Sequence, residues 1–392
     1  MLLTAQTALA APLITSISGT YNSGQSVVIN GSSFGTKTIA SPNKFNNMES
    51  ETIGTIPSDE MISTGTTPHG LVKNNLAHDG TKSLEFDYSA TSVNGSHGMD
   101  WQRNILDLGA TADKIYLTAW VYLDYGTSNS TQWQWKSFTI TSSPKGYYDL
   151  NPTYPSTNLP YSADAYNTTT VFMNYWWNGT AAYFDPANGK YGWFNNHGQA
   201  YNYDNVTTFR NQEAVSPTGA PTDALLWNQW QRLEFYAQRS SAPSTADGIW
   251  REQRIGRSGY TFNYNNVMTH LAGNDSWRYV TLSSALESVY DGTANLKIYM
   301  DDVYVDTTQA RVELCDSSTW SARTHCEIQP ATAWSDTGAT ITLNQGSFTN
   351  GTTAYLYVVD SAGNTSNGQQ VTIGSGSVDT TPPAAPTGLS VI

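Results

Sequence analysis

The sequence has few charged residues. Asp, Glu, Lys and Arg make up 13% of its 392 residues, and 32 acidic residues against 19 basic ones give a net charge of −13. Proteins that bind nucleic acids or anionic membranes neutralise phosphates with a basic stripe, and the sequence has none. The composition therefore argues against both partners. It fits an extracellular surface solvated by acidic residues, and it leaves neutral and cationic ligands open.

The sequence also lacks long apolar runs and helical patterns. No run approaches the roughly 20 residues of a transmembrane helix, so we expect a soluble mature protein. The one candidate for a helical turn is Ser283 to Ser288. Residues 1–11 resemble the end of a signal peptide, with a short apolar run and Ala8-Leu9-Ala10 but no basic leading region. We therefore expect a secreted or cell-surface protein.

Cysteine is nearly absent. The two cysteines, Cys315 and Cys326, lie 11 positions apart between two strand-like segments. This spacing predicts a disulfide-closed hairpin that contributes ~2–3 kcal/mol through the unfolded state. A metal site at this place would need further cysteines or histidines, and His325 is the one histidine nearby.

Aromatic and small polar residues are plentiful instead. The chain has 13 Trp, 24 Tyr and 31 Gly, which together with many Ser, Thr and Asn is typical of secreted all-β proteins. Alternating segments bounded by turn residues predict strands at 83–88, 114–123, 133–141, 170–177, 230–238, 249–255, 277–282 and 296–305. We expect a large two-sheet jelly-roll sandwich, with 142–167 and 178–205 as surface loops.

The two ends of the chain predict a second, divided domain. Alternating strands with turns occupy 12–35 and again 338–373, and each half alone has too few strands to bury a sheet face. We therefore predict one small immunoglobulin-like sandwich from 12–42 plus 309–374. The jelly roll, 43–308, is then an insertion, because such a domain can be accommodated where its own ends lie close together. The Pro-rich tail 375–392 is expected to be extended and mobile.

Both domains resemble known families. The divided one resembles an IPT/TIG domain in Gly24, Gly31, Phe34-Gly35, the strand Tyr355 to Val358 and the turn Asp360 to Gly363. The insert resembles a concanavalin A-like lectin/glucanase domain in FNNMES, IYLTAWVYLD, WNQWQRLEFYAQ, DGIWR and LKIYMDDVYVD. This resemblance implies that glycans bind on the concave face of the jelly roll.

Strand alternation indicates which side chains share a face. In 114–124 the alternate apolar residues that begin at Ile115 are expected to point into the core, so the aromatic residues between them point outward. In 230–238 we expect Leu233, Phe235 and Ala237 to point inward. Aromatic rings stack on pyranose rings, and polar groups beside them fix hydroxyls or a carboxylate. The candidate ligand-binding residues are Trp120, Tyr122, Gln134, Lys136, Arg232, Glu234, Tyr236 and Gln238. Alternatively, the outward aromatics form a small second core beneath a loop.

The sequence leaves catalysis undecided. A glycosidase needs two flanking carboxylates, and the Glu-x-Asp-x-x-Glu strand of the resembling glucanases is absent. Glu234 and Glu252 fall on consecutive strands, although an ion pair of Glu252 with Arg232 or Arg254 is the favoured interpretation. A polysaccharide lyase would place Arg232, Gln134, Lys136 and Tyr236 on one face, but the Gln-x-His and Arg-rich strands of alginate lyases are also missing. The catalytic candidates are Tyr236, Lys136 and Glu234.

Metal and cofactor signals are sparse. The six histidines show no His-x-His or His-Glu-x-x-His spacing, and no organic cofactor is expected. Asp301 and Asp302 are expected to point to opposite sheet faces. Either is a candidate ligand for a structural Ca²⁺ ion, and a hydrogen bond to a neighbouring loop is the favoured alternative.

Three functional hypotheses remain. The first is a carbohydrate-binding protein that recognises an extracellular polysaccharide on the aromatic and polar face. The second is a polysaccharide lyase or glycoside hydrolase on the same face. The third is a structural surface or filament subunit that assembles with itself or with a cell-surface partner through its Ig-like domain and tail.

Overall fold

The computed structural model describes the parts of the chain that form two compact units. Unit 1 comprises Met1–Ser41 and Ala310–Ile392, and unit 2 comprises Pro42–Gln309. The described residues are 10–62, 70–88, 92–93, 98–100, 104–124, 132–141, 171–178, 226, 228–242, 245, 247–256, 261–267, 276–288, 292–293 and 297–376. Within these ranges the regular structure is strands and one 3₁₀ turn, η2 (Trp320–Ala322). The fold is all-β, as the sequence predicts.

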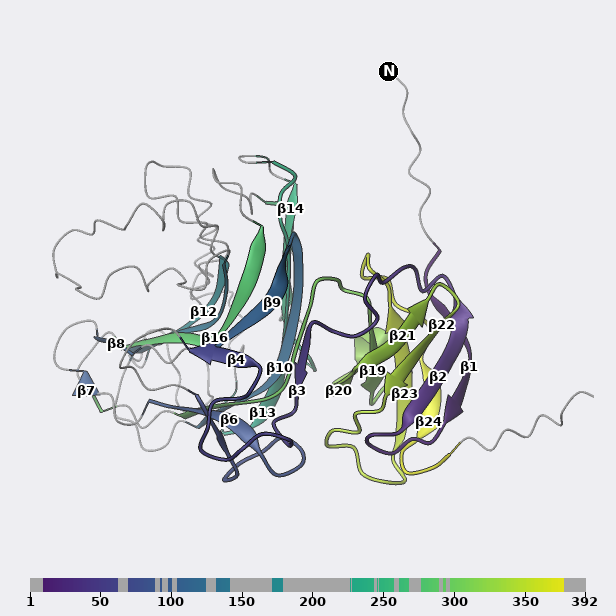
Figure 1. The fold of residues 1–392 in the computed structure, drawn as a ribbon, viewed down its shortest axis with the longest axis horizontal. Helices are drawn as coiled ribbons and strands as arrows, with labels where there is room; N and C mark the ends of the chain where they lie inside the picture. The colour runs from purple at the N-terminus through teal and green to yellow at the C-terminus, as the bar shows by residue number, and fades with distance from the viewer. Residues whose placement is uncertain are drawn as a thin grey trace, which may run out of the picture. The chain divides into compact units, whose positions relative to one another are not determined.

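Unit 1 is an Ig-like sandwich of two four-stranded antiparallel sheets (Figure 1). One sheet has the order β1-β2-β22-β21 and the other β20-β19-β23-β24. The strands are β1 (Leu13–Gly19), β2 (Ser26–Ser32), β19 (Arg311–Cys315), β20 (Cys326–Gln329), β21 (Ala331–Ser335), β22 (Gly338–Thr342), β23 (Thr353–Val359) and β24 (Gln369–Thr372). The first sheet joins strands from both ends of the sequence, because β2 pairs with β22.

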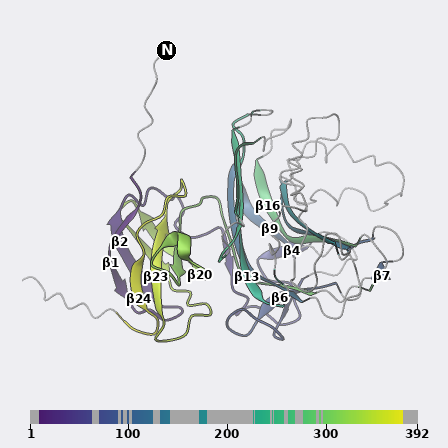
Figure 2. The ribbon, with the colours of Figure 1, turned by 180° about the vertical axis from the view of Figure 1, so that it is seen from behind.

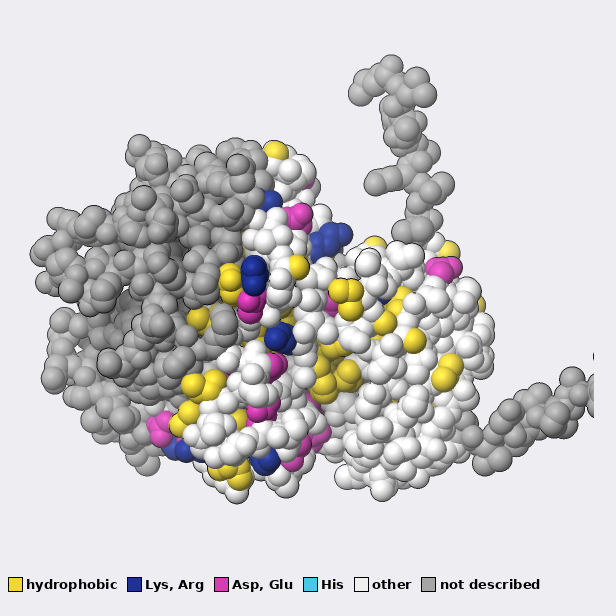
Figure 3. Space-filling view, in the orientation of Figure 1, with side chains coloured by type: hydrophobic (Ala, Val, Ile, Leu, Met, Phe, Trp, Pro, Cys, Tyr) yellow, Lys and Arg dark blue, Asp and Glu magenta, His cyan; other side chains and the backbone are white. Residues whose placement is uncertain are grey.

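Period-two apolar residues form the core of unit 1. Val27 and Ile29 from one sheet and Leu356 and Val358 from the other are fully buried in one cluster. Gly31 allows β1 and β2 to approach closely, because a Cβ atom at this position would lie 2.0 Å from the carbonyl oxygen of Leu13. In the view of Figure 3 most of the surface of this unit is neutral, in keeping with the low charge content of the sequence.

Unit 2 is a sandwich of two larger sheets, seen as separate layers in Figures 1 and 2. The eight-stranded sheet has the order β15-β14-β13-β10-β18-β6-β5, and β3 also pairs with β18; the six-stranded sheet has the order β12-β11-β16-β9-β4, and β8 also pairs with β16. The strands are β3 (Lys44–Asn46), β4 (Glu60–Ile62), β5 (Leu71–Lys73), β6 (Ser83–Asp87), β8 (Gly98–Asp100), β9 (Asn104–Ala112), β10 (Lys114–Asp124), β11 (Gln132–Thr141), β12 (Val171–Asn178), β13 (Trp230–Gln238), β14 (Gly248–Arg254), β15 (Thr261–Val267), β16 (Trp277–Ser288) and β18 (Lys297–Asp306), with a separate pair of β7 (Ser92–Val93) and β17 (Gly292–Thr293).

The core of unit 2 lies between these two sheets. Alternate residues of β10, from Ile115 to Leu123, pack with those of β13 and with Trp135, Phe138 and Trp277 of the six-stranded sheet. All of them are buried. The inward face that the sequence predicts for β10 and β13 is therefore confirmed, and the other residues of β10 and β13 lie on what we call the outer face of the eight-stranded sheet.

The two ends of unit 2 are neighbours within its own sheet. β3, at its start, pairs antiparallel with β18, at its end, so that Lys44 faces Val305. A unit whose first and last strands are paired leaves and re-enters the rest of the chain at adjacent points. This arrangement is what an insertion into another domain requires.

Most sequence-based expectations about local structure agree with these elements. All eight predicted strands are present, and the disulfide Cys315–Cys326 joins directly opposed residues of β19 and β20. The helical turn at 283–288 was wrong: these residues belong to β16, and Ser283, with φ 47°, marks an irregularity in that strand. Loops 142–167 and 178–205 (apart from the strand end at 178), residues 1–9 and most of the tail lie outside the described residues. In the described part of the chain no helix has the length and apolar character needed to span a bilayer.

Candidate functional site

The outer face of the eight-stranded sheet carries most of the predicted site residues. Because alternate residues of β10 and β13 fill the core, Tyr116, Thr118, Trp120 and Tyr122 project from β10 on the other side. The residues directly opposite them on β13 are Tyr236, Glu234, Arg232 and Trp230. This register sets aromatic and charged side chains in cross-strand rows, at distances where they contact one another.

A buried ion pair lies in the middle of this face. The Nη2 atom of Arg232 is 3.2 Å from Oε1 of Glu234, and the two side chains are 1% and 5% exposed. Tyr116 donates a 2.5 Å hydrogen bond to the same oxygen, Gln253 donates to Oε2, and Arg232 Nε donates to Thr118 Oγ1 at 2.9 Å. Both carboxylate oxygens of Glu234 are therefore occupied, as a buried charge requires.

The register separates the two glutamates that the sequence places on neighbouring strands. Glu234 is opposite Gln253, whereas Glu252 is opposite Phe235, a core residue. The register therefore does not set Glu234 and Glu252 opposite each other on β13 and β14. The partner of Glu234 is Arg232, and an ion pair is the interpretation that the structure favours for this glutamate.

Tyr236 lies at the next row of the face. It donates a hydrogen bond to Gln238 Oε1 at 3.2 Å, and the guanidinium of Arg251 lies 5.9 Å from the centre of its ring. Burial raises the pKa of Tyr236 to about 12, although Gln309 and Arg251 act in the opposite direction. At neutral pH this phenol therefore holds its proton and acts as a hydrogen-bond donor.

The other two polar candidates are in the opposite sheet. Gln134 and Lys136 belong to β11, where Gln134 is opposite Trp176 and Glu287, and Lys136 is opposite Asn174 and Ala285. The sequence alone had grouped them with Arg232 and Tyr236 on one face. The structure places them in the six-stranded sheet, so those four residues do not share a sheet.

An aromatic row crosses one end of the outer face. Trp230, Tyr122 and Tyr299 are direct cross-strand neighbours, with ring centroids 5.5 and 6.1 Å apart in edge-to-face contacts. The imidazole of His78 stacks on Trp120 at 3.8 Å and meets Trp230 edge-on at 5.7 Å. Trp120 and Tyr299 are buried, whereas Trp230, Tyr122 and His78 are half-buried. We call these five residues the aromatic row.

Carboxylates border the aromatic row. Burial, and then Glu85, raises the pKa of the Tyr299 phenol, while burial and Asp124 raise that of Tyr122. Glu85 in turn pairs with Lys297 at 3.4 Å.

Sequence reasoning missed Trp230 and His78. The signal for Trp230 was present, because its position continues the period-two series through Arg232 and Glu234.

Asp301 and Asp302 lie at a bulge in β18. Trp120 of β10 is opposite Asp301 and Thr118 is opposite Tyr304, so two residues of β18 face one residue of β10. Asp302 has φ 48°, a conformation that Asp tolerates better than most residues. The bulge corrects the prediction that the two carboxylates point to opposite faces, because both approach the segment of His78 and Asp79.

Asp301 fixes this segment through hydrogen bonds. Its Oδ2 accepts the backbone N–H of His78 at 3.0 Å, and its Oδ1 accepts the N–H of Asp302 at 2.9 Å. The hydrogen bond to a neighbouring loop, the alternative that the sequence favoured over Ca²⁺ for this pair, is therefore present. Burial, followed by the charges of Asp302 and Asp79, raises the pKa of Asp301 well above its usual range.

Asp302 and the neighbouring loop bring together three side chains of types that ligate metals. One ligand atom from each of His78, Asp79 and Asp302 lies within 4.8 Å of the other two. One imidazole nitrogen with two carboxylate oxygens is a ligand set that suits divalent transition metals. Sequence reasoning had singled out Asp302 and missed the other two, because their approach depends on the bulge.

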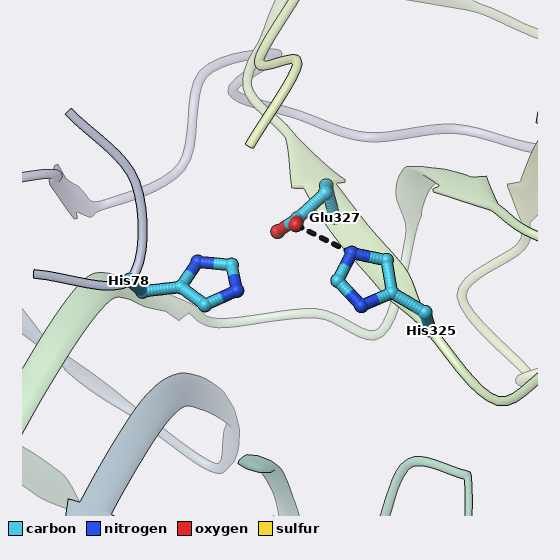
Figure 4. A group of neighbouring side chains, drawn as sticks. All are labelled: His78, His325 and Glu327. Carbon is cyan, nitrogen blue, oxygen red and sulfur yellow. Dashed lines mark hydrogen bonds and ion pairs between the residues drawn. The ribbon is translucent and has the colours of Figure 1, made fainter. Parts of the chain in front are cut away.

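Unit 1 has a polar cluster beside its disulfide. His325 Nε2 lies 2.7 Å from Oε1 of Glu327, which is fully buried, and this contact is drawn in Figure 4. The backbone N–H of Ser347 donates to the same oxygen at 3.1 Å. The cluster satisfies a buried carboxylate next to the Cys315–Cys326 hairpin, which is a structural task.

Comparison with known proteins gives likenesses in structure alone. No protein-family model and no curated protein sequence matches the chain. Similar solved structures include the marine PL-14 alginate lyase from Aplysia kurodai (TM-score 0.37, 11% identity, 60% of this chain and 86% of that one) and the cellulose induced protein Cip1 (0.36, 13%, 68% and 97%). Another is the Emp46p carbohydrate recognition domain in its potassium-bound form (0.25, 10%, 61% and 87%). At this degree of similarity the likenesses say nothing about what this chain binds.

Proposed function

We propose that the protein is a secreted or cell-surface carbohydrate-binding protein that holds an extracellular polysaccharide against the aromatic row. The observation that supports this best is the set of half-buried rings of Trp230, Tyr122 and His78, which line one end of the outer face. Partly exposed rings offer apolar surface to the C–H patches of a pyranose. Buried Trp120 and Tyr299 support them from below and at the side.

The charges on this face favour neutral or cationic sugars over uronates. A uronate carboxylate needs an accessible cation, and Arg232 already pairs with Glu234 inside the sheet. The negative charges of Glu85 and Asp124 raise the pKa of Tyr299 in the aromatic row, and the whole chain carries a net charge of −13. An anionic polymer would approach against this field, whereas neutral and amino sugars would not.

The described residues do not assemble the set needed for a lyase. The reaction requires a cation or amide beside the uronate and a base at the C5 proton. Its raised pKa of about 12 keeps Tyr236 protonated at neutral pH, and Lys136 and Gln134 belong to the other sheet. We therefore place binding, and not elimination, on the outer face. Unsaturated or reducing-end products from a panel of uronate and neutral glycans would overturn this assignment.

We propose that unit 1 is an IPT/TIG-type domain that supports the binding unit and takes no part in binding itself. Its sheet order joins β1 and β2 to β22 across nearly the whole sequence, and the inserted unit begins and ends on the paired strands β3 and β18. A supporting domain of this kind does not require self-association, so we expect the protein to be monomeric. Size-exclusion chromatography over a range of concentrations separates this from the self-assembling subunit of the third hypothesis.

Affinity electrophoresis tests the proposed function. Gels containing neutral, amino-sugar or uronate polysaccharides should retard the wild-type protein in at least one neutral or amino-sugar gel. Trp230→Ala and Tyr122→Ala should abolish the retardation. Trp320→Ala is the matched control, because Trp320 is a half-buried tryptophan of unit 1 that stacks on Arg323 at 3.6 Å. Retardation that survives both row variants would refute the site.

A further inference from the structure

The bulge in β18 brings three metal-ligating side chains together from two segments. His78 and Asp79 belong to the loop between β5 and β6, and Asp302 belongs to the bulge itself. The register slip between Thr118 and Trp120 turns Asp302 toward that loop. Asp301 then bonds to the backbone N–H groups of His78 and Asp302, so the loop and the bulge share one anchor.

The three ligand atoms are close enough to share one ion. They lie within 4.8 Å of one another, and Asp302 is 1% exposed. Ligands at about 2.0–2.2 Å from a tetrahedral Zn²⁺ ion are about 3.3–3.6 Å apart, so small side-chain rotations bring all three into range. Each residue has other contacts. Nδ1 of His78, Oδ1 of Asp79 and Oδ1 of Asp302 are all buried from solvent.

We propose that His78, Asp79 and Asp302 bind one divalent transition-metal ion of the Zn²⁺ type. The imidazole nitrogen selects this class over Ca²⁺ and Mg²⁺, which prefer all-oxygen sets. Three protein ligands leave a fourth tetrahedral position for water. The ion offsets the mutual repulsion of the carboxylates and ties the loop to β18.

The proposed ion also positions part of the aromatic row. The backbone N–H of His78 is fixed by Asp301, and its ring stacks on Trp120. A bond from the metal to a ring nitrogen would fix the rotation of the imidazole about its side-chain bonds. In other metal sites, hydrogen bonds from neighbouring groups fix the orientation of a ligating histidine in a comparable way. The metal site itself does not depend on the proposed glycan function, and the two are tested by different measurements.

Metal titration of the untagged, full-length protein tests the inference. After treatment with EDTA and exchange into chelator-free buffer, the protein is titrated with ZnCl₂, CaCl₂ or MgCl₂ by calorimetry, and the bound metal is counted after dialysis. We expect one equivalent of Zn²⁺, at least 100-fold tighter than Ca²⁺, and a raised unfolding temperature when Zn²⁺ is present. His78→Gln and Asp302→Asn should each weaken Zn²⁺ binding at least 10-fold; Asn is well tolerated at the positive φ of Asp302.

The control is Asp113→Asn, which changes an exposed carboxylate paired with Arg239 and should leave Zn²⁺ binding unchanged. Far-UV circular dichroism identifies any variant that fails to fold. In that event Asp79→Asn, in the half-buried loop, takes its place. Absence of a Zn²⁺ equivalent in the wild type overturns the proposal, as does Zn²⁺ binding that survives the folded variants. Binding of Ca²⁺ that His78→Gln leaves intact also overturns it, because the imidazole would then not be a ligand.

Discussion

The buried pair Arg232–Glu234 yields the most informative prediction about stability. Arg232 is 1% exposed and binds Glu234 at 3.2 Å and Thr118 at 2.9 Å. Arg232→Ala removes the cation and leaves the carboxylate buried beside Tyr116 and Gln253. Removing one partner of a buried ion pair costs about 3–5 kcal/mol, because the remaining charge is desolvated and uncompensated. We expect a loss of this size in the free energy of unfolding of unit 2.

The assay is guanidinium unfolding followed by tryptophan fluorescence. All tryptophans except Trp320 and Trp334 belong to unit 2, so the signal reports mainly that unit. Arg278→Ala is the control, because it breaks the more exposed bidentate pair with Asp107 and should have a much smaller effect.

A double variant separates charge from packing. Arg232→Met combined with Glu234→Leu removes both charges and keeps the volume, so it should regain at least half of the stability lost in Arg232→Ala. Equal stability of Arg232→Ala and Arg278→Ala would refute the reasoning. So would a double variant less stable than Arg232→Ala alone.

Three further predictions concern other parts of the chain. Cys315→Ser with Cys326→Ser should lower the stability of unit 1 by about 2–3 kcal/mol, measured by calorimetry, and a wild type that is insensitive to reductant would contradict this. Burial raises the pKa of Glu60 to about 8, so its stabilising effect is complete below its usual value near 4.5 and is lost as the pH rises to 8. Glu60→Gln should therefore match the wild type near pH 4.5 and exceed it at pH 8 in chemical unfolding; a constant difference would be inconsistent with the raised pKa. Gly31→Ala should destabilise unit 1 by about 1–3 kcal/mol, because the new Cβ meets the carbonyl of Leu13, and an unchanged melting temperature would count against the close approach.

The sequence predicts the strands because burial on one face imposes a period of two. In β10 the residues from Ile115 to Leu123 alternate without interruption, and all of those that face the core are buried. The position of Trp230 on the outer face follows from the same rule. Local alternation therefore suffices for the content of each face.

Alternation alone does not predict to which sheet a strand belongs or where a strand contains a bulge. Alternation describes β11 correctly, with Trp135 in the core, but it does not say which strand pairs with which, so Gln134 and Lys136 were placed with the wrong sheet. The spacing of apolar residues in the sequence does indicate the bulge, because Met300 and Val303 both enter the core although they are three positions apart. An odd spacing between core residues in one strand indicates an extra residue between them. The approach of Asp302 to His78 follows from that residue.

The aromatic row is the centre of the functional proposal, and one titration tests it most directly. Isothermal calorimetry of wild type, Trp230→Ala and Trp320→Ala uses a soluble oligosaccharide of the polysaccharide that retards the wild type most. Loss of one ring stack of about 1.4 kcal/mol corresponds to a 10-fold weaker Kd. The account predicts at least this loss for Trp230→Ala and less than a twofold change for Trp320→Ala. Equal affinities of all three proteins would contradict it.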